Sequence, residues 1–520
     1  MKQFFFLILC LVFAQCASVR FVGDPVVVNP NIPISIPLTS DMKNEWARYD
    51  LVEDSVPGMS VNKAFTDLIK DQKGERVIVA IVDTGMDVQH PAIASKIWIN
   101  EDEVPGNGID DDQNGYVDDI HGWNFLGESQ NENFEYVRLQ KREDLDSDAF
   151  AVFEEKRNKE LQKYRRGLAN LLFVKEELPN ARAALQQALN TKAIDLVAAR
   201  ALSPMTVELS EAILIEEYAQ KTGLTEITLQ KAIEQYQDAL QYHHNLDFEG
   251  RSVVGDDPDN YNDRGYGNPL VQGPDGSNND HATHVAGLVG GLDVGVATSV
   301  KIMPIRALPN GDEYDKDVAL AIRYAVDNGA KIINASFGKS YSPHQDWVHD
   351  AIRYAAEKDV LIVHAAGNDD GNIDPGGSLN FPNDMVGNKE ISDNLITVGA
   401  SHWEYNEQQI ARFSNYGAVN VDVFAPGHKI YSSVPNQQYE QLDGTSMASP
   451  LVAGVAAVLW SHYPKYSAKK IKRIILKSGL PMFSSLSMPS ETDQQKPNYY
   501  SKTGKLVNLY NALLYASKRL

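Results

Sequence analysis

Ser446 is the residue of this 520-residue chain best placed to act as a nucleophile. It lies in residues 444–450, GTSMASP, directly before an apolar stretch with the pattern of a helix. A neutral hydroxyl attacks poorly unless a base removes its proton and an acid orients that base. The hydroxyl and main-chain amide of Ser446 would lie at the N-terminus of the helix, where the partial positive charge favours a developing anion.

Two distant segments supply an acid and a base of the required kind. Asp83 follows the apolar run 77–82, VIVAIV, and Gly85 allows the chain to turn sharply after it. His281 opens residues 281–287, HATHVAG, whose small side chains suit a closely packed helix. Each residue alone is weak evidence. Together, in this order and at the ends of elements, they indicate acyl transfer to Ser446, with His281 as base and Asp83 as the orienting acid.

The order Asp, His, Ser and the surrounding motifs resemble those of the subtilases, the subtilisin-like serine peptidases of family S8. The resemblance covers most of residues 41–145 and 245–520. It implies a serine endopeptidase that hydrolyses extended polypeptides through an acyl-enzyme. It also implies that Asn368, in residues 365–368 (AAGN), donates a hydrogen bond to the oxyanion beside the amide of Ser446.

The same resemblance implies which residues bind the substrate as an added strand and form the walls of the pocket before the scissile bond. These substrate-binding residues are Ser336, Phe337, Gly338, Ala365, Ala366 and Gly367. Asp369 and Asp370, which follow Asn368, suggest the hypothesis that the pocket tolerates a basic residue. Ala282 and Leu451 depart from the family, which usually has glycine and histidine there.

Continuous apolar runs separated by helical patterns predict the fold. The runs at 77–82, 331–335, 360–363 and 395–398 are typical of strands buried on both faces, and 315–328 and 345–358 have helical periodicity. This alternation predicts an α/β fold of three layers, with a mostly parallel central sheet and helices on both faces, as in subtilisin. Ligands bind such sheets beyond the carboxyl ends of the strands. Asp83, Ser336 and Asn368 each come after a predicted strand, so they are expected at that edge.

Composition divides the chain into four kinds of segment. We expect a signal peptide at 1–17, an extended N-terminal arm at 18–44, a peptidase domain formed by 45–144 and 246–520, and a helical insertion at 145–245. Within the insertion, Ser203 and Thr225 are the predicted N-caps of helices. The insertion is interpreted as an exposed decoration, as a lid over the substrate, or as a surface for a partner.

The first residues have the pattern of an export signal, with a short cationic start and an apolar run too short to span a bilayer. The chain is therefore expected to be exported, to the periplasm, the cell surface or the medium, and no transmembrane span is expected. Its two cysteines, Cys10 and Cys16, both lie in this leader, so no disulfide is expected in the rest. Cys16 is also a possible site for a lipid anchor.

A net charge of −22 argues against nucleic acid as a partner. The resemblance to subtilases implies proteins or peptides as substrates. Part of the acidity lies in residues 110–119, which begin like a calcium-binding EF-hand loop. The predicted calcium ligands are Asp110, Asp112, Asn114, Tyr116 and Asp118. The alternative is a hydrogen-bonded turn without metal. Asp256, Asp257 and Asp259 form a second, weaker cluster.

Two other classes of function remain open from the sequence. One is a non-catalytic member of the same fold that binds peptides in the same groove. The other is an adaptor in which the helical insertion is the functional part. No organic cofactor is expected for any of them.

Overall fold

The computed structural model describes residues 20–274, 276, 279–377, 379–387 and 389–518. Its centre is a nine-stranded sheet in the order β12-β13-β9-β8-β5-β4-β1-β3-β2. All neighbouring strands are parallel except the edge pair β12 and β13. The strands are β1 (Val77–Asp83), β2 (Trp123–Asn124), β3 (Val300–Arg306), β4 (Ile332–Ala335), β5 (Leu361–Ala365), β8 (Leu395–Ser401), β9 (Val423–Pro426), β12 (Leu480–Pro481) and β13 (Lys505–Leu506). The mostly parallel sheet is confirmed.

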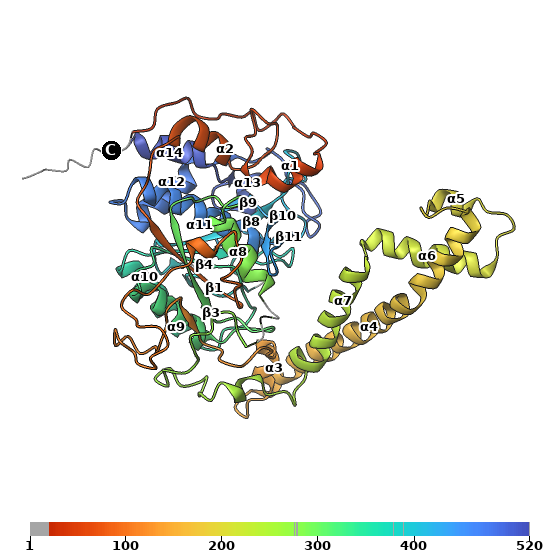
Figure 1. The fold of residues 1–520 in the computed structure, drawn as a ribbon, viewed down its shortest axis with the longest axis horizontal. Coiled ribbons are helices and arrows are strands. Elements are labelled where there is room, and N and C mark those ends of the chain that lie inside the picture. Colours follow the sequence, from red (N-terminus) through yellow and green to blue (C-terminus); the bar gives the residue numbers. More distant parts are fainter. Residues whose placement is uncertain (1–19, 275, 277–278, 378, 388, 519–520) are drawn as a thin grey trace, which may run out of the picture.

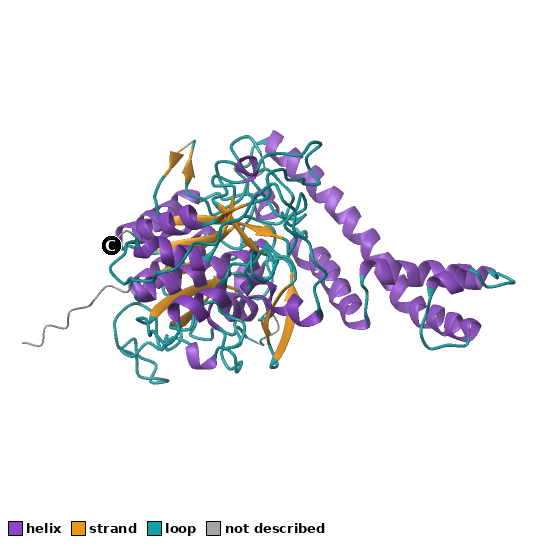
Figure 2. Ribbon diagram, turned by 90° about the horizontal axis from the view of Figure 1, so that it is seen from above, coloured by secondary structure: helices purple, strands orange, loops and turns teal. Residues whose placement is uncertain are grey.

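Helices cover both faces of the sheet, because the buried strands are apolar at successive positions, which point to opposite faces. Val79 and Ile81 of β1 pack against one group of helices, and Ala80 and Val82 pack against the other. The first group is α8 (Asp280–Gly290), α11 (Thr445–His462), α12 (Ala468–Ser478) and α14 (Leu509–Ser517), and the second is α9 (Asp315–Asp327) and α10 (Gln345–Glu357). Figure 1 and Figure 2 show these helices against the strands. The predicted three-layer α/β fold is confirmed.

Short elements complete the body. They are α2 (Val61–Lys63), α3 (Glu135–Gln140), α13 (Pro497–Tyr500), the hairpin of β6 (Met385–Val386) with β7 (Lys389–Glu390), and the hairpin of β10 (Ile430–Val434) with β11 (Gln438–Leu442). In the part of the chain that the structure describes, no helix combines the length and apolar character needed to cross a bilayer.

The N-terminal segment runs over the surface in extended form before its first helix. Phe21 is buried, and its amide donates to Ser517 Oγ (2.8 Å). Ile34 forms an antiparallel bridge with Tyr405. Helix α1 (Ser40–Glu45) then begins within the segment expected to be extended up to 44. The predicted signal peptide, with Cys16, lies outside the described residues.

The helices of the insertion form an arm that projects from the body (Figure 1). The arm consists of α4 (Ser147–Leu189), α5 (Leu196–Arg200), α6 (Val207–Thr222) and α7 (Glu226–Asp238). It has apolar clusters of its own, such as the one in which Leu171 and Val174 pack near Ile233. Thr225 caps α7 as predicted, but the cap predicted at Ser203 is wrong. Helix α6 begins at Val207 because Thr206 Oγ1 accepts the Leu209 amide (3.1 Å).

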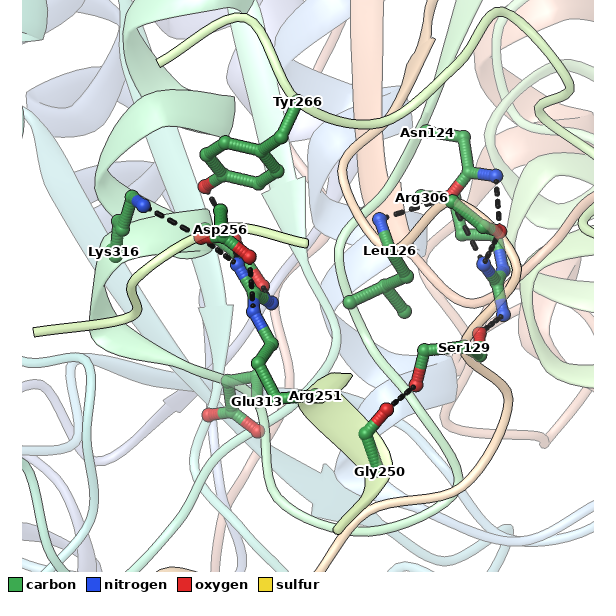
Figure 3. Close-up of polar contacts among 12 residues, drawn as sticks. Asn124, Leu126, Ser129, Gly250, Arg251, Asp256, Tyr266, Arg306, Glu313 and Lys316 are labelled. Carbon is green, nitrogen blue, oxygen red and sulfur yellow. Dashed lines mark hydrogen bonds and ion pairs between the residues drawn. The ribbon is translucent and has the colours of Figure 1, made fainter. Parts of the chain in front are cut away.

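A buried ion network joins the end of the insertion to α9. Arg251 pairs with Asp256 through Nη2 (2.7 Å) and with Asp317 through Nη1 (2.5 Å), and Lys316 Nζ donates to Asp256 (2.6 Å), as Figure 3 shows in part. Asp256 therefore balances buried cations, and the second acidic cluster is not a group of free carboxylates. Asp259 of the same cluster pairs with His344 (2.7 Å).

Candidate active site

Asp83 and His281 lie in direct contact at one edge of the sheet. Asp83 is the last residue of β1 and is fully buried, and its Oδ1 accepts hydrogen bonds from His281 Nδ1 (2.7 Å) and the Thr84 amide (2.7 Å). Since Nδ1 carries the proton shared with Asp83, Nε2 is left as the basic nitrogen. The structure thus joins two of the predicted residues, which are 198 positions apart in the chain.

The carboxylate also controls the basicity of the imidazole. Burial lowers the pKa of His281, and the charge of Asp83 and the hydrogen bond to it oppose this effect. The net result is a pKa above the ordinary value of histidine. His281 remains about one-third exposed, so it is accessible from the cleft.

Ser446 occupies the first turn of α11, which packs against α8. Its Oγ donates a hydrogen bond to the main-chain oxygen of Ser336 (3.0 Å), at the end of β4. Among the described residues, this is the hydrogen bond that the hydroxyl makes, and the contact with His281 is not formed in this state. A hydroxyl changes partner by rotating about χ1, and nucleophile–base hydrogen bonds are often loose before substrate binds.

A buried polar network holds the turn that carries the nucleophile. Ser336 Oγ contacts the Ser446 carbonyl oxygen (2.9 Å) and Ser449 Oγ (2.9 Å). Asn334 Nδ2 donates to Ser336 Oγ (2.8 Å), and Asn334 Oδ1 accepts from Ser449 (3.2 Å). The side chain of Ser336 therefore positions α11, and only its backbone can contribute to substrate binding. The sequence did not reveal the roles of Asn334 and Ser449 in this network, because neither residue belongs to a motif with that role.

The predicted oxyanion donors border one small space. Asn368 Oδ1 accepts hydrogen bonds from the Thr445 amide (2.9 Å) and hydroxyl (3.0 Å), which fixes the orientation of the side-chain amide. A Cβ added at Gly444 would lie 3.5 Å from the Ser446 amide nitrogen and 3.7 Å from Asn368 Nδ2. Gly444 has a φ of +154° and no side chain, so this space between two N–H donors stays open.

Substituting Asn368 with aspartate is expected to lower kcat for peptide hydrolysis by about 10²–10³-fold, with a small change in KM. The aspartate keeps the oxygen that accepts from Thr445, but it replaces the N–H donor with a negative charge. Steady-state kinetics on one peptide measure the effect. Asn436→Asp, at an exposed turn with a φ of +62°, is the matched control. Equal kcat values for Asn368→Asp and the wild type would remove Asn368 from the oxyanion site.

The two predicted walls follow neighbouring parallel strands, β4 and β5, in which Ala335 pairs with His364. The first wall is Ser336, Phe337 and Gly338, and the second is Ala365, Ala366 and Gly367. Gly367 has a φ of +97°, and a Cβ there would lie 2.4 Å from Asn415 Nδ2. His364 Nε2 contacts the Phe337 oxygen (2.8 Å) and so links one wall to the strand of the other.

Comparison with known proteins decides the family of the chain. The Subtilase family (peptidase family S8) matches residues 74–504, which is most of the sequence. The chain belongs to the subtilase family.

This subtilase aligns with named relatives over part of its length. The thermophilic serine proteinase of Bacillus sp. (strain AK1) is 40% identical over 191 residues, which is 35% of this chain and 43% of that protein. Subtilisin DY of Bacillus licheniformis is 36% identical over 200 residues, which is 37% of this chain and 68% of that protein. Among solved structures, that of the Prenylagaramide maturation protease PagA is 28% identical, covers 47% of this chain and 85% of that chain, and has a TM-score of 0.38.

In the acidic loop of this subtilase, carboxylates among the predicted calcium ligands accept hydrogen bonds from main-chain amides. The Asp110 carboxylate accepts the amides of Asn114 (3.0 Å) and Gly115 (2.8 Å). The Asp118 carboxylate accepts the amides of residues 106–108. Tyr116 packs its ring edge-on against Trp123.

The carboxylates that do converge are Glu103, Asp112 and Asp119, with one oxygen from each within 4.8 Å of the others. Asp112 was predicted as a ligand, whereas Glu103 and Asp119 lie outside the loop spacing that suggested the site. Burial raises the pKa of Asp119 to about 6, despite hydrogen bonds from Tyr324 and two asparagines that lower it. These are hard oxygen donors, and Asp119 and Glu103 are buried, so the group fits a divalent cation such as Ca²⁺.

The arm reaches the rim of the active site through α7. Lys231 Nζ lies 3.5 Å from Asp280 Oδ2, next to His281 in the chain, and 3.4 Å from Glu440 Oε2 on β11. All three side chains are about half exposed, so these ion pairs are weak and easily broken.

Proposed function

We propose that this chain is a serine endopeptidase that hydrolyses extended polypeptides through an acyl-enzyme on Ser446. The single observation that carries the proposal is the 2.7 Å hydrogen bond between buried Asp83 and His281 Nδ1, at the carboxyl edge of the sheet. It leaves the other imidazole nitrogen to act as a base, and it favours the imidazolium that forms during the reaction. Family membership supports the same chemistry.

In the first half of the reaction, Ser446 Oγ leaves the Ser336 oxygen, gives its proton to His281 Nε2 and attacks the substrate carbonyl carbon. The carbonyl oxygen becomes an oxyanion, which accepts hydrogen bonds from the Ser446 amide and Asn368 Nδ2. His281 then passes the proton to the departing amine, and an ester on Ser446 remains.

In the second half, water takes the place of the amine. His281 accepts a proton from the water as it attacks the ester carbonyl, and the same donors hold the second oxyanion. Collapse of this intermediate returns the proton to Ser446 Oγ and releases the new carboxylate. Asp83 stays ionised and holds the imidazole through both halves.

The test is cleavage of an unfolded polypeptide by the full chain, before and after treatment with a fluorophosphonate. The proposal expects multiple internal cleavages and complete loss of activity after treatment. A protein that binds the polypeptide but never cleaves it would be the non-catalytic peptide-binding member instead.

We further propose that Ca²⁺ binds at Glu103, Asp112 and Asp119 and stabilises the loop of residues 100–119, in a chain whose described residues include no cysteine. The support is the convergence of three carboxylates, two of them buried, whose mutual repulsion a cation would relieve.

Removal of calcium with a chelator is expected to lower the melting temperature by roughly 2–4 °C, because a ligand at about 100 times its Kd stabilises by ~2.7 kcal/mol and a chain of this size unfolds with an entropy of about 1 kcal/mol per kelvin. Calorimetry with and without added CaCl₂ measures the shift. Asp119→Asn should abolish the difference, while Asp110→Asn should retain it, because the Asp110 carboxylate is not among the three that converge. A melting temperature that no chelator changes in the wild type would refute the calcium site.

Export from the cytoplasm fits the N-terminal leader and is likewise part of the proposal, with a lipid on Cys16 as its membrane-bound form. Mass spectrometry of the native N-terminus distinguishes the lipidated form from the form without lipid, since a lipidated cysteine adds the mass of its acyl chains.

For the arm, the contact of Lys231 with Asp280 supports a role as a lid that covers the substrate, rather than a purely decorative role.

A further inference from the structure

A groove of about 760 Å³ lies on the arm between α4 and α7, two helices that pack together (Figure 1). Its floor is apolar, because Leu178 and Leu229 belong to the core of the arm and are buried. Pro179 and Ile227 add exposed apolar surface at its sides, and Ile227 is 69% exposed. Exposed apolar surface beside such a floor offers a place for apolar side chains of another polypeptide segment.

Positive charge surrounds this apolar surface. The charged side chains that line the groove are Lys175, Arg182, Glu226 and Lys231. Lys175 Nζ donates to Gln230 Oε1 (2.7 Å), which is a neutral group and leaves the charge of the lysine unbalanced. Arg182 is balanced by the buried carboxylate of Glu216 (2.8 Å). Two lysines therefore face one glutamate, and the groove is cationic on a chain whose net charge is −22.

Lys231 joins the groove to the active site. It lines the groove, and its Nζ also lies 3.5 Å from Asp280 Oδ2 and 3.4 Å from Glu440 Oε2. Asp280 directly precedes His281, which in the proposed reaction gives its proton to the departing amine. The groove is therefore expected to open toward the half of the substrate that follows the scissile bond, whereas the two walls hold the half before it.

We infer that the groove between α4 and α7 is a second binding site for polypeptide substrates. It takes a segment that follows the cleaved bond and carries acidic and large apolar side chains. The apolar side chains cover Pro179 and Ile227, and the carboxylates pair with Lys175 and Lys231. Because the exposed ion pairs of Lys231 are weak, a substrate carboxylate can replace Asp280 as its partner. The inference rests on the proposed peptidase function.

A second copy of this chain is the main competing occupant of the groove. A copy seated there would meet the rim of the active site at Asp280 and hinder the entry of substrate. A substrate held in the cleft, by contrast, brings its own following segment to the groove at high effective concentration. The position of Lys231 in both sites therefore favours the substrate.

The experiment measures kcat/KM of the full chain for peptides that share the residues around one cleaved bond. One peptide is short, and two others carry a C-terminal extension of about 12 residues, which spans about 40 Å when extended. The extension contains leucine with either glutamate or lysine. We expect the glutamate extension to raise kcat/KM about 10-fold, mainly through KM, and the lysine extension to raise it less than about 2-fold. The glutamate extension placed before the cleaved bond should give no gain, and about 0.5 M NaCl should reduce the gain by screening.

Variants of the groove test which residues produce this gain. Lys175→Glu and Ile227→Ser should each reduce it to less than about 3-fold, because one removes a cation and the other removes apolar surface. Both side chains are exposed, so the fold is expected to be kept, which circular dichroism checks. Lys192→Glu makes the same charge change at an exposed position of the arm that does not line the groove. This matched control should keep the full gain.

The outcomes separate this inference from the proposed function. Equal kcat/KM values for the short and the glutamate-extended peptide would overturn the groove as a substrate site, as would an equal loss of the gain in Lys192→Glu. A dimer in sedimentation that Ile227→Ser converts to a monomer, with no gain from the extension, would assign the groove to a second copy instead. In these cases cleavage of the short peptide leaves the peptidase function intact. A chain that neither cleaves the short peptide nor reacts with a fluorophosphonate would overturn the peptidase function itself.

Discussion

Replacing Ser446 with alanine is expected to lower kcat for peptide hydrolysis by about 10⁶-fold, the size established for the same loss in subtilisin. The reason is that the covalent step disappears, while the groove and the oxyanion donors remain. The residual rate above that of water, about 10³–10⁴-fold, then comes from binding and from the oxyanion donors. Active-site titration and steady-state kinetics on one peptide measure the change.

Ser487→Ala is the control for this variant, because Ser487 is exposed and lies outside the cleft. Circular dichroism should show the same fold for both variants. If Ser446→Ala retained a tenth or more of the wild-type kcat, Ser446 would not be the nucleophile.

The second large effect is expected at Asp83. Asp83→Asn should lower kcat by roughly 10³–10⁴-fold, because the imidazolium of His281 loses the charge that stabilises it. The Thr84 amide requires an acceptor at the same position, so the asparagine oxygen is expected to face Thr84 and His281, and the shape of the site is kept.

This variant should also change the pH dependence in a defined direction. The Asp83 carboxylate raises the pKa of His281, and His281 must be neutral to act as a base. The wild-type kcat/KM should therefore increase with pH through a pKa above the ordinary histidine value. In Asp83→Asn the same limb should move to lower pH. Asp87→Asn, four residues further along the same loop, is the control and should leave both kcat and the pH profile near those of the wild type. If the rise of kcat/KM with pH occurred at the same pH in Asp83→Asn as in the wild type, the proposed role of the Asp83 charge would be contradicted.

The candidate catalytic residues stand out in the sequence because each ends a strand or begins a helix with a strong pattern. Asp83 follows a run of six apolar residues, and Ser446 precedes an apolar helix rich in small residues. Because the strands of the sheet are parallel, their carboxyl ends and the residues that follow them lie at one edge of the sheet. What the pattern could not show is the rotamer of Ser446 or the network of Asn334, Ser336 and Ser449 below it, since these depend on side-chain packing.

The acidic loop shows where local spacing is insufficient. Alternate oxygen ligands predict one calcium loop, and in the structure the Asp110 and Asp118 carboxylates of that loop accept hydrogen bonds from main-chain amides. The converging group includes Glu103, which lies before the motif, and Asp119, which lies after the predicted ligands.

The most direct measurement of the central claim is the site and rate of covalent modification by a fluorophosphonate. Peptide mapping by mass spectrometry should place the adduct on Ser446 alone, and His281→Ala should slow its formation by at least 10³-fold, since the hydroxyl then lacks its base. An adduct on another residue, or labelling of Ser446 at an unchanged rate in His281→Ala, would contradict the account.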